Sequence, residues 1–209
     1  MNDGKRPYRS RRRREQAAET REKILAAARK LFVSAGYGQT TIESIAVEAG
    51  VAVPTVYATL GSKRGLLMAL LDQMAEAANR PRMLAALEAA RGDPRRQLRE
   101  VLAFSVRLYV RGADIIGIAR AVAGVEPDLR DLWEEGEARR YRAVRALAKE
   151  WQASGALVPG LTRQQATDTV WALAGPDVFR LFVVQRRWSR SRYEEWLGKT
   201  LEGLLFGPL

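Results

Sequence analysis

Residues 40–67 read TTIESIAVEAGVAVPTVYATLGSKRGLL, and this stretch governs the interpretation of the whole chain. Thr40 followed three residues later by Glu43 is the pattern of a capping box, which predicts that a helix begins here. Four apolar residues then recur at helical spacing and share one face: Ile42, Ile45, Ala46 and Ala49. Gly50 follows them, and a residue without a Cβ suits the left-handed position that ends a helix. The first half of the stretch therefore predicts a short helix that ends at Gly50.

A second short helix is predicted directly after a turn. Val51 is apolar within that turn, where it can pack between two crossing helices. Pro54 suits the first helical position because a helix leaves that N–H unpaired in any case. Val53 carries no oxygen that could cap the helix, so we expect the N–H groups of Thr55 and Val56 to be free for a phosphate or a base edge. Two helices joined by a tight turn predict a helix-turn-helix, whose second helix enters the major groove of DNA.

Length and composition limit the class of protein. The 209 residues are 47% hydrophobic, which is enough to build the core of one large or two small domains. No apolar run approaches the roughly 18 residues that a membrane-spanning helix needs. The basic N-terminus lacks the apolar segment of a secretory signal. We therefore expect a cytoplasmic protein without a membrane partner.

The chain contains neither cysteine nor histidine. Disulfides and thiolate metal sites are therefore excluded, and the commonest general base and metal ligand is missing. No pair of carboxylates, Ser–Lys spacing or phosphate-binding loop of the G-x-x-x-x-G-K type stands out. The sequence predicts a protein that is not an enzyme and that carries no metal or other cofactor.

The positive charge of the chain is concentrated at its N-terminus. The net charge is +11, and residues 1–14 alone contribute +6. We expect a run of like charge this dense to be disordered, and one interpretation is a solvated tail. The alternative is an arm that lies along or inside a DNA groove, as basic arms do in other DNA-binding proteins. The candidate arm residues are Arg9, Arg11, Arg12, Arg13 and Arg14.

Apolar stripes at helical spacing recur along the chain, and no alternating strand pattern of convincing length occurs, so the predicted fold class is all-α. Ser62 is a natural cap for a long helix that reaches about Ala78, and Asn79-Arg80-Pro81 then interrupts the pattern. We predict three parts: a basic disordered arm over 1–14, a helix-turn-helix DNA-binding domain with its connecting helix over 15–78, and a helical regulatory and dimerisation domain over 79–209.

Turn and capping residues set the helix boundaries predicted within 79–209. The expected elements are a short helix over 83–90, a helix from Asp93-Pro94 that Gly112 stops, a helix over 114–123, a long helix over 127–153, a helix that Thr162 caps and Pro176 kinks or breaks, and a last helix after Ser189 or Ser191.

Residues 40–67 resemble the DNA-binding segment of the TetR family of bacterial transcriptional regulators. The residues that carry the resemblance are Thr40-Thr41, Ile45-Ala46, Ala49-Gly50-Val51, Thr55, Tyr57, Ser62-Lys63 and Leu66. Residues 24–37, ILAAARKLFVSAGY, are similar to the first helix of the same family. The resemblance covers roughly residues 20–70. Beyond them, the chain resembles the family only in length and helical layout.

The resemblance assigns roles on DNA. Thr41, Thr55, Tyr57 and Lys63 occupy positions that usually contact phosphates in this family; such contacts fix the register without reading the sequence. The positions that usually face the base edges hold Ala52, Val53, Pro54, Ala58 and Thr59. Small apolar side chains can touch a thymine methyl but cannot make a bidentate base contact. We therefore expect DNA shape and the basic arm to supply part of the specificity.

The regulatory part offers candidates for a ligand site and for a dimer interface. Possible cavity residues are Phe104, Arg107, Tyr109, Trp133, Trp171 and Phe179, with core packing and solvated surface arginines as competing interpretations. In the TetR family the last two helices form a four-helix dimer interface. The resemblance therefore implies a homodimer through the large apolar residues of these helices: Phe182, Trp188, Tyr193, Trp196, Leu197, Leu201 and Leu204.

These features predict a ligand-responsive DNA-binding transcriptional regulator, a repressor that an unknown small molecule releases from a palindromic operator. Its expected partners are double-stranded operator DNA, a second copy of the chain and that small molecule. A two-fold dimer would read a palindrome because a single half-site binds weakly. The alternative is a non-specific basic architectural protein, which the net charge of +11 and the arm favour.

Overall fold

The computed structural model describes the backbone of residues 5–207 and, from Arg12 onward, their side chains except those of Asp128 and Leu132. Within these residues every element is helical, which confirms the all-α fold class. No described helix is both long and apolar enough to cross a membrane. The elements are α1 (Lys5–Ser34), α2 (Ile42–Ala49), α3 (Val53–Leu60), α4 (Lys63–Ala77), α5 (Arg80–Ala89), α6 (Pro94–Ala123), α7 (Pro127–Ala153), α8 (Arg163–Leu173), α9 (Pro176–Phe179), the π-helical segment η1 (Arg180–Gln185) and α10 (Arg190–Phe206).

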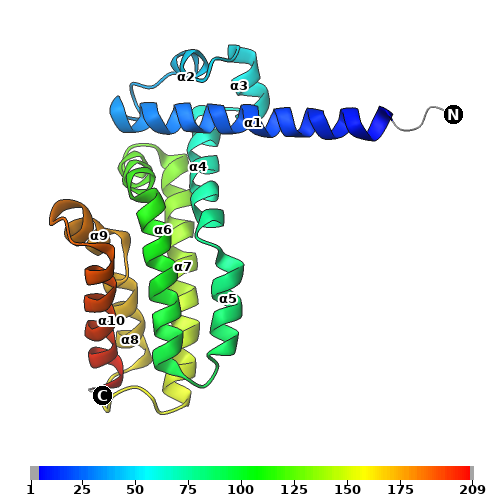
Figure 1. Ribbon diagram of the computed structural model, residues 1–209. Helices are drawn as coiled ribbons and strands as arrows, with labels where there is room; N and C mark the ends of the chain where they lie inside the picture. The colour runs from blue at the N-terminus through cyan, green and yellow to red at the C-terminus, as the bar shows by residue number, and fades with distance from the viewer. Residues whose placement is uncertain (1–4, 208–209) are drawn as a thin grey trace.

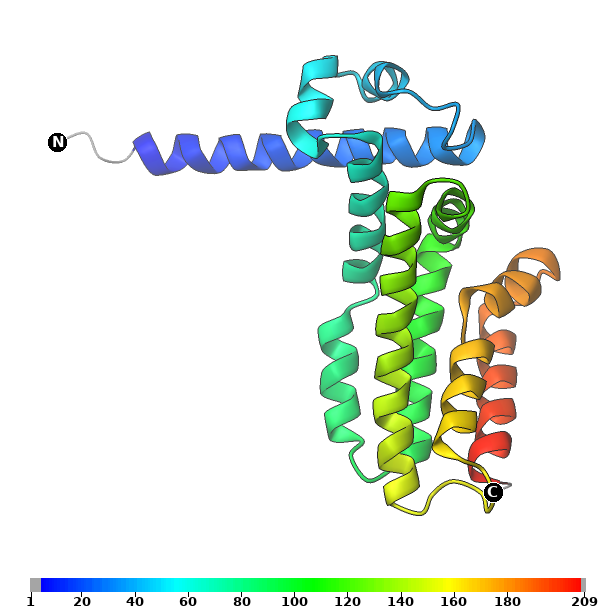
Figure 2. The ribbon, with the colours of Figure 1, turned by 180° about the vertical axis from the view of Figure 1, so that it is seen from behind.

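Helices α1–α3, which we call the head, lie across one end of a helical body formed by α5–α10 (Figure 1). Helix α1 runs crosswise over that end, with its N-terminus extending away from the rest of the molecule. Helix α4 leads from the head into the body. Seen from behind, α6 and α7 run side by side through the body, with α5 on one flank and α8 and α10 on the other (Figure 2).

The head is built on the C-terminal half of α1. Ile24, Leu25 and Phe32 are each at most 1% exposed, and they share one core with Ile45 of α2 and Val56 of α3. Burial of each such side chain contributes roughly 1.5–3 kcal/mol. The same core continues into the body through Ile115, Ala119 and Val122 of α6. The head is therefore seated on the body by apolar packing.

The expectation of a disordered arm is wrong for the backbone of residues 5–14, which form the N-terminal third of α1. Pro7 lies in the first turn, where a helix tolerates proline. Most of the following residues are Arg, Glu, Gln and Ala, which favour helix and lose little entropy in it. Once the buried stripe from Ile24 onward has formed a helix, each further residue extends it without a new nucleation step.

The capping box at the start of α2 lies one residue later than the sequence predicts. Thr41 is the N-cap, and its hydroxyl accepts from the amide of Ser44 at 3.1 Å, while the Ser44 hydroxyl oxygen accepts from the Thr41 amide at 3.1 Å. Thr40 is buried instead, and its hydroxyl donates to the carbonyl of Gly36 at 2.8 Å. Threonine can cap a helix at either position, and because the Thr40 hydroxyl is used by Gly36, Thr41 caps α2 although Ser44 rather than Glu stands three residues after it.

Helix α6 passes through Gly112 rather than ending there. Gly112 has non-helical angles, φ −141° and ψ 15°, so α6 is kinked at this point and continues to Ala123. A Cβ on Gly112 would lie 1.8 Å from the sulfur of Met74 in α4, so the absence of a side chain permits close packing of the two helices. The kink divides α6 into a first half within the body and a second half beneath the head.

Other predicted boundaries agree with the structure. Asn79, in the left-handed region at φ 58°, separates α4 from α5, although α5 begins at Arg80 rather than at 83. Side-chain oxygens of Asp93, Thr162 and Ser189 cap α6, α8 and α10. The break expected at Pro176 separates α8 from α9.

Candidate nucleic-acid interface and regulatory cavity

Two glycines fix the backbone of the helix-turn-helix. Gly50 ends α2 in the left-handed conformation, φ 66° and ψ 37°, and the amide of Val51 then donates to the carbonyl of Ala46 at 3.0 Å. Gly65, in the first turn of α4, has no room for a side chain, because a Cβ there would lie 2.0 Å from the Leu60 carbonyl oxygen. The sequence motif revealed the role of Gly50; the close approach at Gly65 became visible only in the structure.

Helix α3 starts one residue earlier than predicted, with Val53 as its first residue and Ala52 as its N-cap. No side chain caps this end, as expected. However, the amide of Thr55 donates to the carbonyl of Ala52 at 2.9 Å, so the expectation that this N–H is free is wrong. The 3₁₀-type bond tightens the first turn and satisfies a group that we had assigned to an outside acceptor.

The four candidate phosphate contacts differ in how far they reach solvent. Thr41 and Tyr57 are exposed, and the Tyr57 side chain is 50% accessible on the outer side of α3. Thr55 is half-buried. Lys63 donates to the carbonyl of Tyr37 at 2.9 Å, and its ammonium lies 4.4 Å from the centroid of the Tyr37 ring. An ammonium has three N–H donors, so two of them remain for a phosphate.

The candidate base-facing surface is poor in polar groups. Ala52, Pro54 and Ala58 are exposed, whereas Val53 packs partly against the core of the head. Thr59 is half-buried, and its hydroxyl donates to the carbonyl of Thr55 at 2.6 Å within the helix. Its one hydroxyl proton is therefore used, and the side chain can only accept a hydrogen bond. The surface consists of small apolar contacts without a group for bidentate base recognition.

The basic segment of α1 is exposed wherever its side chains are described. Arg12, Arg13 and Arg14 are all open to solvent. Arg9 and Arg11, the other candidate arm residues, have side chains outside the described residues. The helical backbone keeps the three described arginines on a rigid element that continues directly into the core of the head.

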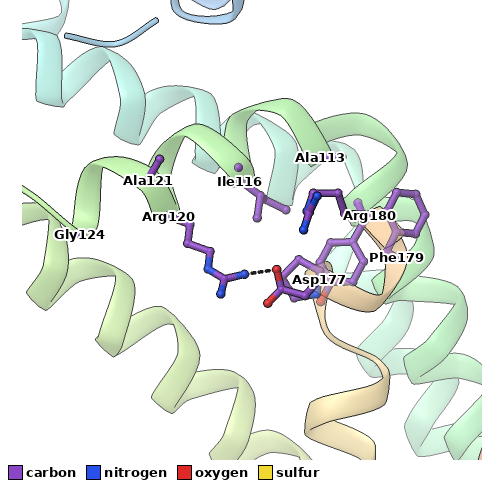
Figure 3. A pocket seen from close by; sticks show the side chains of 11 residues that line it. Ala113, Ile116, Arg120, Ala121, Gly124, Asp177, Phe179 and Arg180 are labelled. Carbon is purple, nitrogen blue, oxygen red and sulfur yellow. Dashed lines mark hydrogen bonds and ion pairs between the residues drawn. The ribbon is translucent and has the colours of Figure 1, made fainter. Parts of the chain in front are cut away.

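A cavity of about 490 Å³ lies between the second half of α6 and α9 (Figure 3). Its lining includes Tyr109 and Phe179 from the predicted set; their ring centroids are 5.6 Å apart. The Tyr109 hydroxyl donates to the carbonyl of Ala174 at 3.1 Å. Small residues form much of the wall on the α6 side: Ala113, Gly117 and Ala121 of α6, and Gly124 at its C-cap. Sequence reasoning missed this wall because small residues carry no chemistry that marks them.

The other four candidate cavity residues do not line this space. Arg107 donates to the carbonyl of Ala78 at 3.4 Å, and Trp171 lies beneath Arg140, 5.0 Å from its guanidinium. Phe104 is half-buried on the first half of α6. Trp133 packs partly against both apolar cores. Core packing and helix contacts, rather than a cavity, account for these positions.

Three charged residues lie at the cavity. Arg120 of α6 forms an ion pair with Asp177 of α9 across it, and both side chains are about half exposed. Arg180 reaches the same space from the start of η1 (Figure 3). Arg120 and Asp177 did not stand out in the sequence as cavity residues, since each is one charged position among many.

The second half of α6 also holds the head. Arg29 of α1 donates to both carboxylate oxygens of Asp114, at 2.9 and 2.8 Å, and to the carbonyl of Arg111 at 2.7 Å. Asp114 lies two residues after the kink at Gly112 and one residue after Ala113 of the cavity wall. The same short segment of α6 therefore contacts both the cavity and α1.

The predicted dimer interface is wrong for three of its residues. Tyr193, Leu197 and Leu201 are at most 1% exposed within a single chain, so they cannot reach a partner. Their spacing of four places them on the face of α10 that packs against α6 and α8. Phe182, Trp188 and Trp196 form a half-buried aromatic cluster, with the Phe182 and Trp196 centroids 4.4 Å apart. The exposed apolar residues of this region are Leu204 (50%), Leu181 (45%) and Val184 (54%).

Comparison with known proteins agrees with this architecture. The model of the bacterial regulatory proteins of the tetR family matches residues 24–70, which run from the buried part of α1 through α2 and α3 to the first half of α4. The HTH-type transcriptional repressor NicS of Pseudomonas putida is 32% identical over 154 residues, which are 74% of this chain and 67% of that protein.

Solved structures share the whole fold. A transcriptional regulator from Saccharomonospora viridis, in complex with choline, superposes with a TM-score of 0.72 at 22% identity, over 90% of this chain and 98% of that one. The fatty acid degradation regulator FadR from Bacillus halodurans reaches 0.72 at 16% identity, over 88% and 95%. The head matches a family model, a relative aligns over most of the chain, and the fold is common to regulators. The chain belongs to the TetR family of bacterial transcriptional regulators.

Proposed function

We propose that this chain is a homodimeric, cytoplasmic repressor that binds a palindromic operator and releases it when a small molecule occupies the body. One observation carries the proposal: the same segment of α6 lines the cavity through Ala113 and Ile116 and holds α1 through the ion pair of Asp114 with Arg29. A ligand that moves this segment also moves the head. The repressor relative NicS and the choline complex of a structural relative support the two halves of the proposal.

In this proposal the DNA backbone is held by Thr41, Thr55, Tyr57 and Lys63. Thr41 and Tyr57 offer exposed hydroxyls, and Lys63 is already oriented by its bond to the Tyr37 carbonyl. An ammonium held in place loses less side-chain entropy on binding a phosphate than a free lysine would. These groups would set the register and contribute affinity that does not depend on sequence.

Sequence preference would come from outside the short side chains of α3. Ala52, Val53, Pro54, Ala58 and Thr59 offer methyl groups and one committed hydroxyl, which suit thymine methyls rather than hydrogen-bonded base edges. DNA shape and half-site spacing in a two-fold dimer would supply much of the discrimination. The arginines in the N-terminal part of α1 would add contacts to DNA phosphates outside the half-site.

The dimer would form through the outer face of α8 and α10 together with η1. The predicted residues that remain available are Phe182, Trp188, Trp196 and Leu204, and the exposed Leu181 and Val184 extend the same apolar surface. Dimerisation would set the distance between the two heads. A ligand could then act by changing that distance, because it would bind the DNA-incompetent arrangement better than the competent one.

A salt-titrated binding assay tests the proposal. Fluorescence anisotropy would compare DNA from upstream of the protein's own coding sequence with a random duplex of equal length. A repressor should prefer the upstream DNA by about 10³ or more at physiological salt. Equal affinity for the two duplexes would contradict the proposal and favour the architectural alternative suggested by the net charge of +11.

Substitutions separate the roles within the interface. Lys63→Ala should weaken binding to both duplexes alike and lower the salt slope by about one per half-site. The matched control is Lys199→Ala, which removes an exposed lysine of α10 that pairs with Glu195 in the body. A change in sequence preference without loss of affinity would remove Lys63 from the phosphate-binding set. Solution scattering with and without a bound effector would measure the separation of the heads.

A further inference from the structure

The charges around the cavity between α6 and α9 define the class of molecule that it suits. This step rests on the proposed function, because it treats the cavity as the effector site. Arg120 and Arg180 contribute two positive charges and Asp177 one negative charge, so the described lining carries a net charge of +1. A cationic group placed here would meet two guanidinium groups for one carboxylate. An anionic group would meet two attractive guanidinium groups and one repulsive carboxylate.

The two arginines are not equally committed. Arg120 pairs with Asp177, but both partners are half exposed, at 53% and 51%, and such solvent-screened pairs contribute little to stability. Arg180 is exposed and forms no ion pair or hydrogen bond with any residue that the structure describes. A ligand carboxylate can therefore bind Arg180 directly and share Arg120 with Asp177. Guanidinium groups favour such partners because two parallel N–H groups match two carboxylate oxygens.

The rest of the lining offers little to a polar neutral molecule. The Tyr109 hydroxyl donates to the Ala174 carbonyl, so Tyr109 presents mainly its ring to the cavity. Phe179 and Pro176 add apolar surface from α9. A hydroxyl or amide on a ligand would lose its water without gaining a fixed partner, which is unfavourable.

The shape of the cavity points to a ring. Phe179 lines the cavity from α9, with its ring tilted by 54° to that of Tyr109, and Ala113, Gly117 and Ala121 lie on the same face of α6 as Tyr109. A Cβ added at Gly117 would meet nothing within 4 Å, so the space above α6 is open at this point. The volume of about 490 Å³ falls within the range of small-molecule sites, roughly 300–1,000 Å³.

We propose that the cavity between α6 and α9 binds an aromatic carboxylate, with its ring between Phe179 and the small residues of α6 and its carboxylate between Arg180 and Arg120. The ring supplies apolar burial, and the carboxylate supplies selectivity. Asp177 limits the affinity, because it competes with the ligand for Arg120.

Matched probes test the charge of the ligand on the purified full-length protein without DNA. Isothermal titration calorimetry would compare naphthalene-2-carboxylate with naphthalene-2-carboxamide and with 2-naphthylmethylamine, which keep the ring and change the charge. The carboxylate should bind at millimolar concentration or tighter, and the amide and the amine at least tenfold more weakly. Equal binding of the three probes, or no binding of the carboxylate at millimolar concentration, would overturn the proposal.

Four variants locate the binding. Arg180→Gln should weaken the carboxylate about tenfold, whereas Arg145→Gln, an exposed arginine of α7 outside the lining, should leave it unchanged. Asp177→Asn should tighten it severalfold, an increase that damage to the fold would not produce. Gly117→Leu should fill the cavity and abolish binding of every probe. Unchanged binding in Arg180→Gln and Gly117→Leu would place the carboxylate elsewhere and end the proposal.

A separate DNA-release assay distinguishes this inference from the proposed function. If the carboxylate binds as described but never releases operator DNA, the ligand class stands and the effector role of the cavity fails. If a neutral or cationic molecule releases DNA, and Gly117→Leu abolishes that release, the effector role stands and the ligand class is wrong.

Discussion

The head and the body of this protein are organised by different constraints. In the head and at its junction with α4, backbone geometry is the constraint: Gly50 adopts φ 66°, and a Cβ on Gly65 of α4 would lie 2.0 Å from the carbonyl oxygen of Leu60. In the body, side-chain volume is the constraint: α6 and α10 contribute large aromatic and aliphatic residues to one core, and a cavity of about 490 Å³ lies between α6 and α9. A head that contacts the DNA backbone must hold its own backbone in a fixed geometry, whereas the described body has to fit only its own core.

The largest difference in stability between the two regions is expected when a glycine in each is replaced by alanine. Gly65→Ala in α4 should destabilise the protein by about 3 kcal/mol or more, because backbone rather than a flexible side chain must move. Gly117→Ala in α6 should stabilise it by up to about 1 kcal/mol, since its Cβ meets no atom within 4 Å and alanine favours helix. Chemical denaturation monitored by circular dichroism measures both. Equal effects at the two positions would remove the distinction drawn between head and body.

Alkaline pH should weaken both regions at once. Burial raises the pKa of Tyr37 in the head and of Tyr109 in the body to about 12, from an ordinary value of 10.0. Between these two values the unfolded chain releases protons that the folded chain retains, so the free energy of unfolding should fall as pH rises from about 10 to 12. The loss should be about 2–3 kcal/mol for Tyr109 alone. Below about pH 9 both tyrosines stay protonated in the folded and the unfolded chain, so they should not make the free energy of unfolding depend on pH.

Tyrosine-to-phenylalanine variants identify the source of that loss. Tyr109→Phe and Tyr37→Phe should each flatten the fall in stability above pH 10, when urea unfolding is measured across the pH range. Tyr57→Phe, at an exposed position on α3, is the control and should leave the profile unchanged. An identical alkaline profile in all three variants would show that other groups control it.

The body contains a buried tyrosine hydroxyl, that of Tyr193, without a hydrogen-bond partner among the described residues. Tyr193→Phe removes a polar atom that was desolvated without compensation, so it should stabilise the protein by about 1 kcal/mol. Tyr109→Phe should do the opposite at neutral pH, because it leaves the Ala174 carbonyl without its donor. Thermal unfolding of the two variants gives the comparison, and destabilisation by Tyr193→Phe would argue for a partner to that hydroxyl.

The smallest effect on stability is expected where head and body meet. The Arg29–Asp114 ion pair is partly exposed, at 43% and 33%, so Asp114→Asn should cost less than about 1 kcal/mol. It should nevertheless change operator affinity, because it loosens α6 from α1. Asp131→Asn, at an exposed position on α7, is a matched control. Loss of stability without any change in DNA affinity would make the ion pair structural only.

Much of the head could be predicted from the sequence, because local rules determine it. Gly50 ends α2 in the left-handed conformation, as predicted. Ala46 and the apolar residues at helical spacing are buried on one face, also as predicted. Two errors there were shifts of a single residue, at the cap of α2 and at the start of α3. The other two were the amide of Thr55, which is hydrogen-bonded, and residues 5–14, which are helical. Thr40 with Glu43 fits the usual capping pattern better, but the hydroxyl of Thr40 donates to the Gly36 carbonyl, and Thr41 caps α2 with Ser44.

The body was less predictable because its sites depend on which face of a helix turns inward. Residues 193, 197 and 201 looked like an interface since they are large and apolar, but their common face packs within the chain. Trp171 looked like a cavity residue and instead contacts Arg140. The contribution of Ala113 and Gly117 to the cavity could not be recognised from the sequence, because small residues without functional groups occur throughout the chain and only the fold shows which of them leave space.

Because α1 is one continuous helix, its N-terminal end should move further than the rest of the head when the head rotates. The helix holds 30 residues, and roughly 20 of them precede the buried stripe that begins at Ile24. At 1.5 Å per residue its free end lies about 30 Å from the pivot, so turning the head by about 10° would sweep that end through about 5 Å. A flexible tail would absorb such a rotation. A rigid helix multiplies it, so a small adjustment near Asp114 would carry the terminal arginines across the width of a phosphate step.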